Sequence, residues 1–553
     1  MRLRENILRR LGDGVFDVLI LGGGINGAVS AAALSSRGAR VALIDRGDFA
    51  GETSQSSSNL AWGGIKYLET FEFGLVRKLC RARNRLIRAY PSTVQEIRFF
   101  TAHPKGFRHG LFKLVVGALF YWLIGDFFTR GPRRLSLAAM EREEPIVRLD
   151  GCDGGFEYSD AFLHDNDARF VFGFVRAALD HGCAAANYVE SLGARREGGL
   201  WITRARDATS GRTFEIRSRA VVNACGPWAD AHNALLGEKT AHKHVFSKGI
   251  HIIVDRLTPH RRVLTFFADD GRLFFVIPMG PKTCIGTTDT RVSAPEVAVT
   301  AEDRRFVLEN INKRLRLPRP LTEADIIAER CGVRPLVVPA EGTGQGKDWT
   351  QLSRKHVIEV DPQTAHLTIF GGKITDCLNV GEEVCAELGK LGIALPFAGR
   401  VWYGEPPAAV RDEYFHQARL MDLDALTSPR SSEKLSTRLW RRYGANALAL
   451  LENIRADPAM GEILIEGAEY LRGEIDYAAR REMVVKLSDF LRRRSKIELV
   501  VRREELLAAR GLREACAILF GPEAEERLAE YAGAAVGAGA DALQIRAKLR
   551  GLT

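Results

Sequence analysis

The spacing of hydrophobic residues near the start of the chain predicts a strand, a turn, a helix and a second strand. A mostly apolar run covers 16–21, and a glycine-rich turn follows at 22–27. An alanine-rich segment then leads to the apolar run 41–44, which ends at Asp45. Short apolar runs bounded by glycine are typical of buried strands, and the segment between them has the length of a helix. This order predicts a βαβ unit.

The middle of the chain combines one strong helix pattern with several strand patterns. Residues 165–182 place apolar side chains such as Phe170 at helical spacing. A Gly-Gly pair within 196–201 predicts a hairpin turn. We expect mainly helices and loops over 60–144, and a turn into a second region at 153–160. Runs rich in β-branched and aromatic residues predict strands at 200–203, 213–217, 220–224, 273–278 and 284–288.

The pattern changes after about residue 396. Residues from about 411 to 552 are dominated by helix formers, with apolar residues at amphipathic spacing. The whole pattern therefore predicts an α/β chain with a Rossmann-like dinucleotide-binding domain, a mixed-sheet substrate domain and an all-helical C-terminal cap domain.

The glycine turn carries the first candidate chemistry. It has Gly-x-Gly-x-x-Gly spacing. Gly22 permits a tight turn, Gly24 allows the backbone to approach a pyrophosphate closely, and Gly27 allows the helix to pack closely on the sheet. The following helix offers free N–H groups to phosphates. Asp45, at the end of the second strand, is placed to accept hydrogen bonds from ribose hydroxyls. By itself this unit fits NAD or FAD.

Composition indicates the chemistry of possible partners only in outline. The formal net charge is +10 and the pI is about 9.2, which favours phosphorylated metabolites, acidic lipids or nucleic acid as partners. We find no nucleic-acid-binding module, and predict no nucleic-acid partner. The nine cysteines form no C-x-x-C pair, which indicates reduced thiols in a cytosolic protein and neither a disulfide framework nor a metal site. Residues 1–10 are charged and lack the apolar core of a signal peptide.

One apolar segment has two interpretations. The uncharged run 114–125, between Lys113 and Asp126, is shorter than the roughly 20 residues that cross a bilayer as a helix. It is either a buried helix or a helix lying in a membrane interface. Thirteen Lys and Arg residues within 77–134 face only Glu96 and Asp126, and basic flanks of this kind are attracted to anionic lipids.

Further candidate site residues lie in short polar or glycine-rich segments. A serine run at 53–58 precedes Gly63-Gly64, and a strand at 221–225 ends in Gly226-Pro227. Either could surround a dinucleotide, or be an ordinary loop and strand end. Arg334 and Lys373 each stand beside glycine or proline, as in anion sites, but isolated surface cations have the same appearance. His251 begins an apolar strand; it is either structural or a base for a substrate hydroxyl.

These motifs, in this order, resemble the FAD-dependent glycerol-3-phosphate dehydrogenases of the D-amino-acid-oxidase-like flavoprotein superfamily. The resemblance extends from about Asp17 to Arg503. The blocks that carry it are GGGINGA at 22–28, the serine run with GGIKYLE at 63–69, GFEYSD at 155–160, NACGPW at 223–228, Lys248-Gly-x-His251, IGTTD at 285–289, GVRPL at 332–336, FGGKIT at 370–375 and RRYGAN at 441–446.

The resemblance implies non-covalently bound FAD and a division of the chain into domains. Within 1–400, an FAD-binding domain (about 14–80, 150–240 and 355–395) is interleaved with a substrate and membrane-facing domain (about 81–149 and 241–354), and 401–553 form the helical C-terminal domain. The cofactor-binding residues are expected to be Gly22, Gly24, Ile25, Asn26, Gly27, Asp45, Ser54, Ser57, Ser58, Leu60, Gly226 and Gly372.

The resemblance also implies the reaction and its surroundings. It implies oxidation of sn-glycerol 3-phosphate to dihydroxyacetone phosphate, with hydride transfer to flavin N5 and electrons passed to quinone or another acceptor. His251, Arg334 and Lys373 are the expected catalytic residues, and Lys66, Tyr67, Arg334 and Lys373 the expected substrate-binding ones. The expected location is the cytoplasmic face of the inner membrane, as a peripheral protein, or the cytoplasm. A homodimer is compatible with the family.

Three positions depart from the family pattern. Trp62 and Lys66 stand where bacterial members have histidine and arginine, and Asp376 stands where threonine is common. Lys66 keeps a positive charge but loses the bidentate fork of arginine. These changes bear on the substrate more than on the cofactor, so oxidation of another phosphorylated or acidic hydroxy compound is the alternative function.

Overall fold

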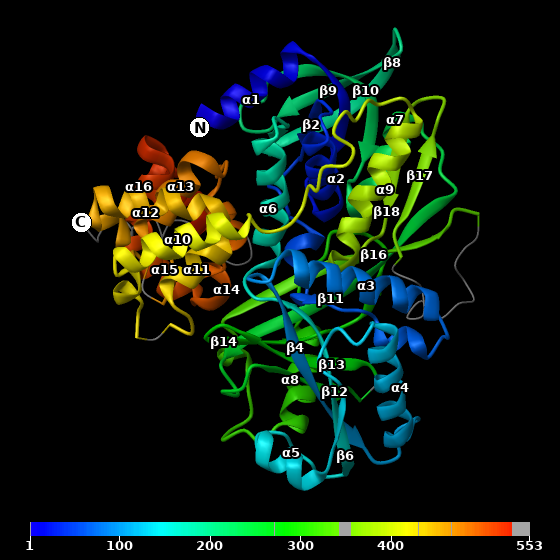
Figure 1. The fold of residues 1–553 in the computed structure, drawn as a ribbon, viewed down its shortest axis with the longest axis vertical. Helices are drawn as coiled ribbons and strands as arrows, with labels where there is room; N and C mark the ends of the chain where they lie inside the picture. The colour runs from blue at the N-terminus through cyan, green and yellow to red at the C-terminus, as the bar shows by residue number, and fades with distance from the viewer. Residues whose placement is uncertain (1, 270, 342–354, 430, 466, 534–553) are drawn as a thin grey trace. The chain divides into compact units, whose positions relative to one another are not determined.

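The computed structural model describes residues 2–269, 271–341, 355–429, 431–465 and 467–533. The chain divides into two compact units, one of residues 7–405 and one of residues 1–6 with 406–553 (Figure 1). Helix α1 (Arg2–Asp13) begins in the smaller unit and ends in the larger. Residues 342–354 of the predicted substrate domain and 534–553 of the predicted helical domain lie outside the described residues.

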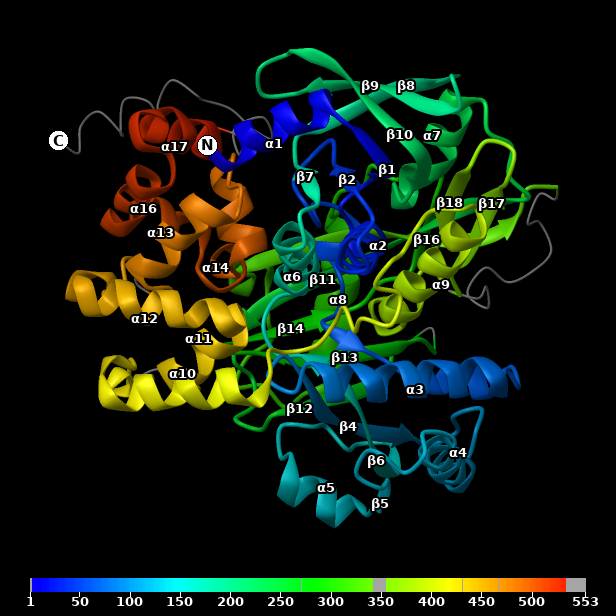
Figure 2. The ribbon, with the colours of Figure 1, turned by 45° about the horizontal axis from the view of Figure 1, so that its top comes forward.

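The first sheet of the larger unit contains the predicted βαβ unit. Its central strands run parallel in the order β18-β10-β1-β2-β7, and antiparallel strands extend it on β18 and β10. Helix α2 (Ile25–Ser36) lies between α6 (Asp167–Asp180) and α9 (Cys377–Lys390) (Figure 2). The strands are β1 (Val15–Leu21), β2 (Val41–Ile44), β7 (Ala184–Ala186), β8 (Val189–Glu197), β9 (Leu200–Asp207), β10 (Thr213–Asn223), β17 (Val357–Asp361) and β18 (His366–Phe370).

Several local predictions are confirmed in this sheet. The predicted helix at 165–182 is α6, and β8 and β9 form the predicted hairpin, turning at Gly198-Gly199 with positive φ at both glycines. The two runs predicted at 213–217 and 220–224 are one strand, β10, because no turn residue separates them.

The second sheet is mixed and has ten strands. Its main path is β15-β11-β14-β13-β12-β4-β6-β3, with β16 paired to β11 and β5 to β6. The strands are β3 (Leu60–Ala61), β4 (Val94–Pro104), β5 (Arg133–Leu135), β6 (Cys152–Leu163), β11 (His242–Asp255), β12 (Arg262–Phe267), β13 (Leu273–Met279), β14 (Lys282–Gly286), β15 (Thr290–Val292) and β16 (Ala328–Pro339).

One expectation for this region is incomplete and another is wrong. The segment 60–144 contains the eleven-residue strand β4 in addition to helices α3 (Phe73–Ala89), α4 (Leu111–Ile124) and α5 (Leu137–Glu143). The supposed turn at 153–160 lies inside strand β6, which pairs with β4. Glycine and acidic residues suggested a turn, but the sheet buries β6 and supplies hydrogen bonds along its length.

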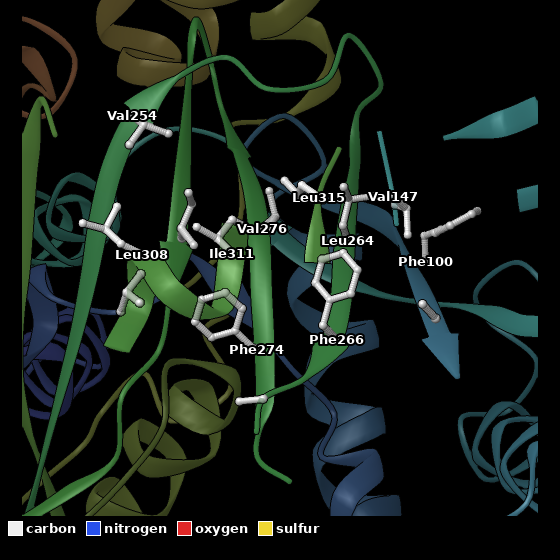
Figure 3. Packing of buried hydrophobic residues seen from close by; sticks show 14 of the residues in the cluster. Phe100, Val147, Val254, Leu264, Phe266, Phe274, Val276, Leu308, Ile311 and Leu315 are labelled. Carbon is white, nitrogen blue, oxygen red and sulfur yellow. The ribbon is translucent and has the colours of Figure 1, made fainter. Parts of the chain in front are cut away.

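The core of this sheet packs against α8 (Ala301–Arg314). Val307, Leu308 and Ile311 of α8 meet apolar side chains of β12 and β13, among them Phe266 and Phe274 (Figure 3). Side chains alternate between the two faces of a strand. The face of the sheet opposite α8 is therefore free to carry polar side chains.

Helix α4 is the apolar segment with two interpretations, and the interpretation as a buried helix is wrong. Only Leu111, Ala118, Tyr121 and Ile124 of the helix are buried. Five of its other apolar side chains are exposed: Phe112 is 77% exposed, and Val116, Leu119, Phe120 and Leu123 are 40–49% exposed. Phe71, Phe73 and Phe127 add further exposed apolar surface, and the Phe73 ring packs edge-on against Phe120.

The described part of the smaller unit is built from helices, as predicted for this region. Tyr414, Leu439, Trp440 and Leu451 belong to its core. The helices of 406–533 are α10 (Ala408–Leu420), α11 (Leu435–Tyr443), α12 (Ala447–Ala456), α13 (Arg472–Arg481), a π-helical segment (Asp489–Arg494), α14 (Ile497–Val500), α15 (Arg503–Ala508), α16 (Arg510–Phe520) and α17 (Ala524–Gly533). Among the described helices of the whole chain, none has the length and hydrophobicity needed to cross a membrane.

Candidate functional site

The glycine turn between β1 and α2 leaves no room for side chains. A Cβ at Gly22 would lie 2.6 Å from the Ala224 carbonyl oxygen, and one at Gly27 would lie 1.8 Å from the Gly22 carbonyl oxygen. Gly22 also has φ +97°, which favours glycine. The turn is thus held against β10, and the first turn of α2 packs directly on it. Gly24, the N-cap of α2, provides no capping side chain to the helix N-terminus.

Asp45 lies at the end of β2, beside this turn. Its carboxylate accepts hydrogen bonds from the Gly23 N–H at 2.6 Å and the Gly47 N–H at 2.8 Å. Burial raises the pKa of Asp45, and these two bonds together with Arg46 oppose the rise. The carboxylate is therefore fixed beside the glycine turn, and its contact with a ribose stays a prediction.

A cavity of about 290 Å³ opens at the carboxyl ends of β1, β2 and β10. Ligands of parallel α/β sheets bind at this edge. Eight of the twelve predicted cofactor residues line it: Gly22, Gly24, Ile25, Asn26, Asp45, Ser54, Gly226 and Gly372. Arg46, Glu190, Trp228 and His232 also line it and were missed; Trp228 follows the Gly226-Pro227 turn and was within reach of sequence reasoning.

Two polar features of the cavity fit a dinucleotide such as FAD. The Asn26 side chain donates to the Gly371 carbonyl at 2.9 Å, while its Oδ1 is buried and accepts no hydrogen bond from the described residues. A Cβ at Gly372, whose φ is +108°, would lie 2.9 Å from that oxygen. The two ends of the site, at 22–27 and 371–372, therefore meet around a backbone-lined space that suits phosphate and ribose groups.

The serine run extends from this cavity toward the second sheet. Ser54 accepts a hydrogen bond from the Ile25 N–H at 3.0 Å, at the start of α2. Ser57, Ser58 and Leu60 do not line the cavity; Ser58 contacts His251, and Leu60 pairs with Phe162 in β3. Gly27 also lies behind the cavity, where it serves packing.

His251 is buried on β11, and its imidazole is neutral at ordinary pH. Its Nε2 lies 3.0 Å from the Ser58 hydroxyl, while Nδ1 has no hydrogen-bond partner among the described residues. Burial lowers the pKa of His251 to about 3, with the charges of Arg330 and Arg334 acting in the same direction. A buried nitrogen of this kind can accept a proton from a substrate hydroxyl only while the ring stays uncharged.

Arg334 lies on the same face of the β11–β16 pair as His251. It donates to the Thr287 hydroxyl at 2.8 Å and the Thr288 carbonyl at 3.2 Å, and pairs with Asp289 at 3.4 Å. Its guanidinium lies over Gly249, where a Cβ would come within 2.4 Å of the guanidinium carbon. Strand and threonine contacts thus hold one cation near His251.

Lys373 and Tyr67 form the second polar group of the site. The Lys373 ammonium donates to the Tyr67 hydroxyl at 3.0 Å and lies 4.4 Å from the centre of its ring. Lys66 lies 5.5 Å from the same ring. Two positive charges therefore flank one buried phenol, an arrangement that attracts an anionic ligand group.

Trp62 occupies a position inside this region. Its indole N–H donates to the Tyr158 hydroxyl at 3.3 Å, and its ring meets Phe275 edge-on. The Thr375 hydroxyl donates to the Trp62 carbonyl at 3.2 Å, which links the Lys373 turn to the loop before Lys66. The Trp62 ring thus packs on side chains of β6 and β13, and its backbone joins the two predicted substrate-binding segments.

Asp376, the third departure, joins a buried charged network. His356 places Nδ1 2.9 Å from an Asp376 carboxylate oxygen and Nε2 2.8 Å from Glu383. Lys78 pairs with Glu383 at 2.9 Å and lies 3.8 Å from Asp376. Burial alone would lower the pKa of His356, but the hydrogen bonds of Asp376 and Glu383 outweigh it, so the pKa is raised.

We expect this network to make stability depend on pH. Because the pKa of His356 is higher in the folded protein, its stabilisation is complete below about pH 6.5, the unfolded value, and is lost as pH rises through the folded value. The melting temperature should fall by a few degrees between pH 6.5 and 8.5, and this fall should shrink in His356→Gln. Differential scanning fluorimetry measures it.

The control for this prediction is His260→Gln, which replaces an exposed histidine of the same unit. It should keep the parent's dependence of melting temperature on pH. Equal pH dependence in the parent and in His356→Gln would show that the network does not contribute.

Comparisons with known proteins agree with this geometry. The model of the FAD dependent oxidoreductase family matches residues 17–363, and the C-terminal domain of alpha-glycerophosphate oxidase matches residues 363–527. A glycerol-3-phosphate dehydrogenase of Pseudomonas aeruginosa is 30% identical over 88% of this chain and 92% of its own length. The aerobic glycerol-3-phosphate dehydrogenase of Escherichia coli K12 is 30% identical over 87% and 93%.

A solved structure gives the same fold. The glycerol-3-phosphate dehydrogenase of Bacillus halodurans, determined with FAD, superposes with a TM-score of 0.69 at 23% identity, covering 96% of both chains. The fold and the cavity thus define a flavoprotein oxidoreductase that binds FAD. Within that class, the chain belongs to the FAD-dependent glycerol-3-phosphate dehydrogenase family.

Proposed function

We propose that this enzyme oxidises sn-glycerol 3-phosphate to dihydroxyacetone phosphate. Two groups of residues carry the proposal: Lys373 and Lys66 lie beside Tyr67, and Arg334 lies on the face of the β11–β16 pair that carries His251. FAD, when bound, supplies the acceptor for the hydride from C2 of the substrate. Asp45, Asn26 and the N-terminus of α2 would hold its ribose and pyrophosphate.

The protein side chains then have separate tasks. Arg334 and the Lys373–Tyr67 pair, with Lys66, bind the substrate phosphate and polarise the developing carbonyl. His251, neutral and buried, takes the hydroxyl proton. The Trp62 ring packs against Phe275, and its carbonyl accepts the Thr375 hydroxyl, so it supports the segments that carry Lys66 and Lys373.

Anaerobic bleaching of the bound flavin tests the substrate. Sn-glycerol 3-phosphate should reduce the flavin completely at millimolar concentration, and glycerol, which lacks the phosphate, should not. Bleaching by lactate-type hydroxy acids in place of sn-glycerol 3-phosphate would support the alternative function, for which Trp62 and Lys66 are the motivation. If none of these compounds reduces the flavin, the protein would be a flavin-binding scaffold.

We further propose that the enzyme docks on the cytoplasmic face of the inner membrane and passes its electrons to quinone. The exposed side chains of α4, with Phe71, Phe73 and Phe127, form an apolar patch, and Arg77, Arg81, Lys113 and Arg130 surround it in the sequence. Burying each large apolar side chain in lipid contributes about 1.5–3 kcal/mol, and anionic headgroups attract the cations. A homodimer stays a prediction from the family resemblance.

Removing two side chains of the patch should abolish docking. We expect the double variant Phe112→Asp with Leu123→Asp to lower binding to vesicles of phosphatidylcholine and phosphatidylglycerol at least tenfold, because two apolar groups are lost and two repelling charges gained. Vesicle sedimentation at low and high salt measures binding. The control is Val401→Asp, at an apolar residue of the larger unit that is 71% exposed. Parent protein that stays in the supernatant at low salt would exclude docking.

A further inference from the structure

Arg330 is an arginine that the proposed chemistry leaves unused, although it lies directly beside His251. Strands β11 and β16 pair so that His251 stands opposite Arg330, Gly249 opposite Gly332, and Ser247 opposite Arg334. Residues two apart on a strand share one face, so Arg330 and Arg334 project from the same surface of the sheet. Arg334 is partly accessible, but Arg330 is only 1% exposed.

The burial of Arg330 in its surroundings costs free energy. Its Nη1 donates to the Ser57 carbonyl at 2.7 Å and to the Asn59 side chain. Its Nε and Nη2 donate no hydrogen bond to any described residue, and the paired carboxylate, Asp167, lies 3.7 Å from Nη2. A buried ion pair with incomplete hydrogen bonds stabilises a fold less than apolar residues of the same volume would. The ion pair is therefore weak evidence that Arg330 serves stability alone.

The contacts of Arg330 and Asp167 converge on one turn of the backbone. Arg330 binds the carbonyl of Ser57, and Asp167 accepts the N–H of the same residue at 2.8 Å. Asn59, which follows with φ +57°, is held by Arg330 and by the Asp165 carbonyl at 3.0 Å. Both backbone groups of Ser57 and the turn at Asn59 are thus fixed from two elements, α6 and β16.

Ser58 lies between these two fixed residues, and it contacts His251. Its hydroxyl stands 3.0 Å from His251 Nε2. Gly332 permits this arrangement, because a Cβ there would come within 2.6 Å of Ser56. The turn can therefore pack closely against the sheet, which brings the Ser58 hydroxyl to Nε2 of His251.

We propose that Arg330, with Asp167, is a positioning pair that holds the Ser57–Asn59 turn, so that the Ser58 hydroxyl engages Nε2 of His251 and leaves Nδ1 as the nitrogen that receives the substrate proton. The pair acts through geometry, by fixing Ser58, and through charge, because a guanidinium beside the imidazole opposes its protonation. The charged groups that face His251 are Arg330 and Arg334, both from β16; β14 presents Gly286 to it. The proposal rests on the proposed role of His251 as the base.

Two substitutions separate geometry from charge. Arg330→Lys keeps the charge and loses the planar fork, whereas Arg330→Met loses both. Arg304→Met is the matched control, because Arg304 pairs with Glu329, the neighbour of Arg330 on β16, and contacts neither Ser57 nor Asn59.

The first measurement is anaerobic stopped-flow reduction of the bound flavin by sn-glycerol 3-phosphate as a function of pH. We expect both Arg330 variants to keep FAD and to reduce it at least tenfold more slowly, with a smaller change in the apparent substrate affinity. In Arg330→Met the acidic fall of the rate should move to higher pH, because removal of the cation raises the pKa of His251. In Arg330→Lys it should stay at the parent position. Arg304→Met should match the parent.

The second measurement needs no substrate. Long-range ¹H–¹⁵N NMR of histidine-labelled holoenzyme, with the His251 signal assigned by its loss in His251→Gln, reports the tautomer and protonation of the ring directly. The parent should carry its proton on Nε2 and stay neutral at pH 5, whereas Arg330→Met should show mixed tautomers. If the flavin is not reduced by sn-glycerol 3-phosphate but this NMR change occurs, the proposed function fails and the positioning pair stands.

Parent-like flavin reduction and parent-like His251 spectra in Arg330→Met would overturn the proposal. If that variant does not fold, Ser58→Ala provides the test, because it removes the hydroxyl and leaves Arg330 and Asp167 in place. It should give the same slow reduction and the same mixed tautomers. The double variant Ser58→Ala with Arg330→Lys should reduce its flavin only slightly more slowly than either single variant, since both changes disturb the same contact with His251. Fully additive losses of rate would contradict the proposal.

Discussion

Arg334→Ala should raise the KM for sn-glycerol 3-phosphate by about two orders of magnitude while FAD stays bound. A charge-assisted contact with a phosphate in a partly buried site contributes about 1.5–3 kcal/mol, and about 1.4 kcal/mol corresponds to a factor of ten. Arg334 is held by Thr287, Thr288 and Asp289 on the substrate side of β16 and does not line the cofactor cavity. Steady-state kinetics with an artificial acceptor and the absorbance of bound flavin measure the two quantities.

A neighbouring arginine provides the control. Arg291 lies on β15, opposite Ser247 of the strand that also pairs with β16, and it is exposed. Arg291→Ala should keep the parent KM within about twofold, as is usual for surface substitutions. If Arg334→Ala oxidised sn-glycerol 3-phosphate as well as the parent does, the assignment of Arg334 to the substrate would be wrong.

His251→Gln should slow flavin reduction by about 10²–10⁴-fold, the usual contribution of a positioned general base. Because the pKa of His251 is lowered to about 3, the parent holds this ring neutral as pH falls, until pH approaches that value. His251 should therefore cause no loss of rate between pH 5 and 8. Rapid-mixing reduction of the flavin across this range measures both effects.

His366→Gln is the matched control for His251. His366 is also a buried histidine whose pKa burial lowers, to about 4, but it lies on β18 and does not line the cofactor cavity. Its replacement can lower stability and should leave the rate constant of flavin reduction close to that of the parent. Equal losses in the two variants would assign the effect of His251 to folding and not to proton transfer.

Local sequence was sufficient for the βαβ part of the cofactor site. The turn at Gly22, the helix that follows and Asp45 lie within thirty residues, and their spacing alone fixes their geometry. The helix α6 and the hairpin at 198–199 were predictable for the same reason. In these segments the hydrogen bonds are local, so the pattern of residue types contains the information.

The substrate half depends on contacts that no local pattern contains. Ser58 meets His251 across 193 residues, and Lys373 meets Tyr67 across 306. Arg330 lies four residues before Arg334, but this spacing places both on one face only once 328–339 is known to be strand β16, a strand that we did not predict. The exposure of α4 was equally hidden, because its sequence is apolar on most sides and only packing decides which of them are covered.

Strand β11 sets the spacing between the cofactor and substrate parts of the site. His244 accepts a hydrogen bond from the Gly371 N–H at the cofactor turn, Ser247 faces Arg334, and His251 faces Arg330. Since side chains alternate along a strand, losing or gaining one residue between His244 and His251 would turn one of them to the opposite face. An insertion or deletion in β11 should thus disrupt the site. The hairpin tip at Gly198-Gly199, in contrast, is exposed and free of close neighbours. That tip is the natural place to graft a label or affinity tag onto the larger unit without disturbing the chemistry.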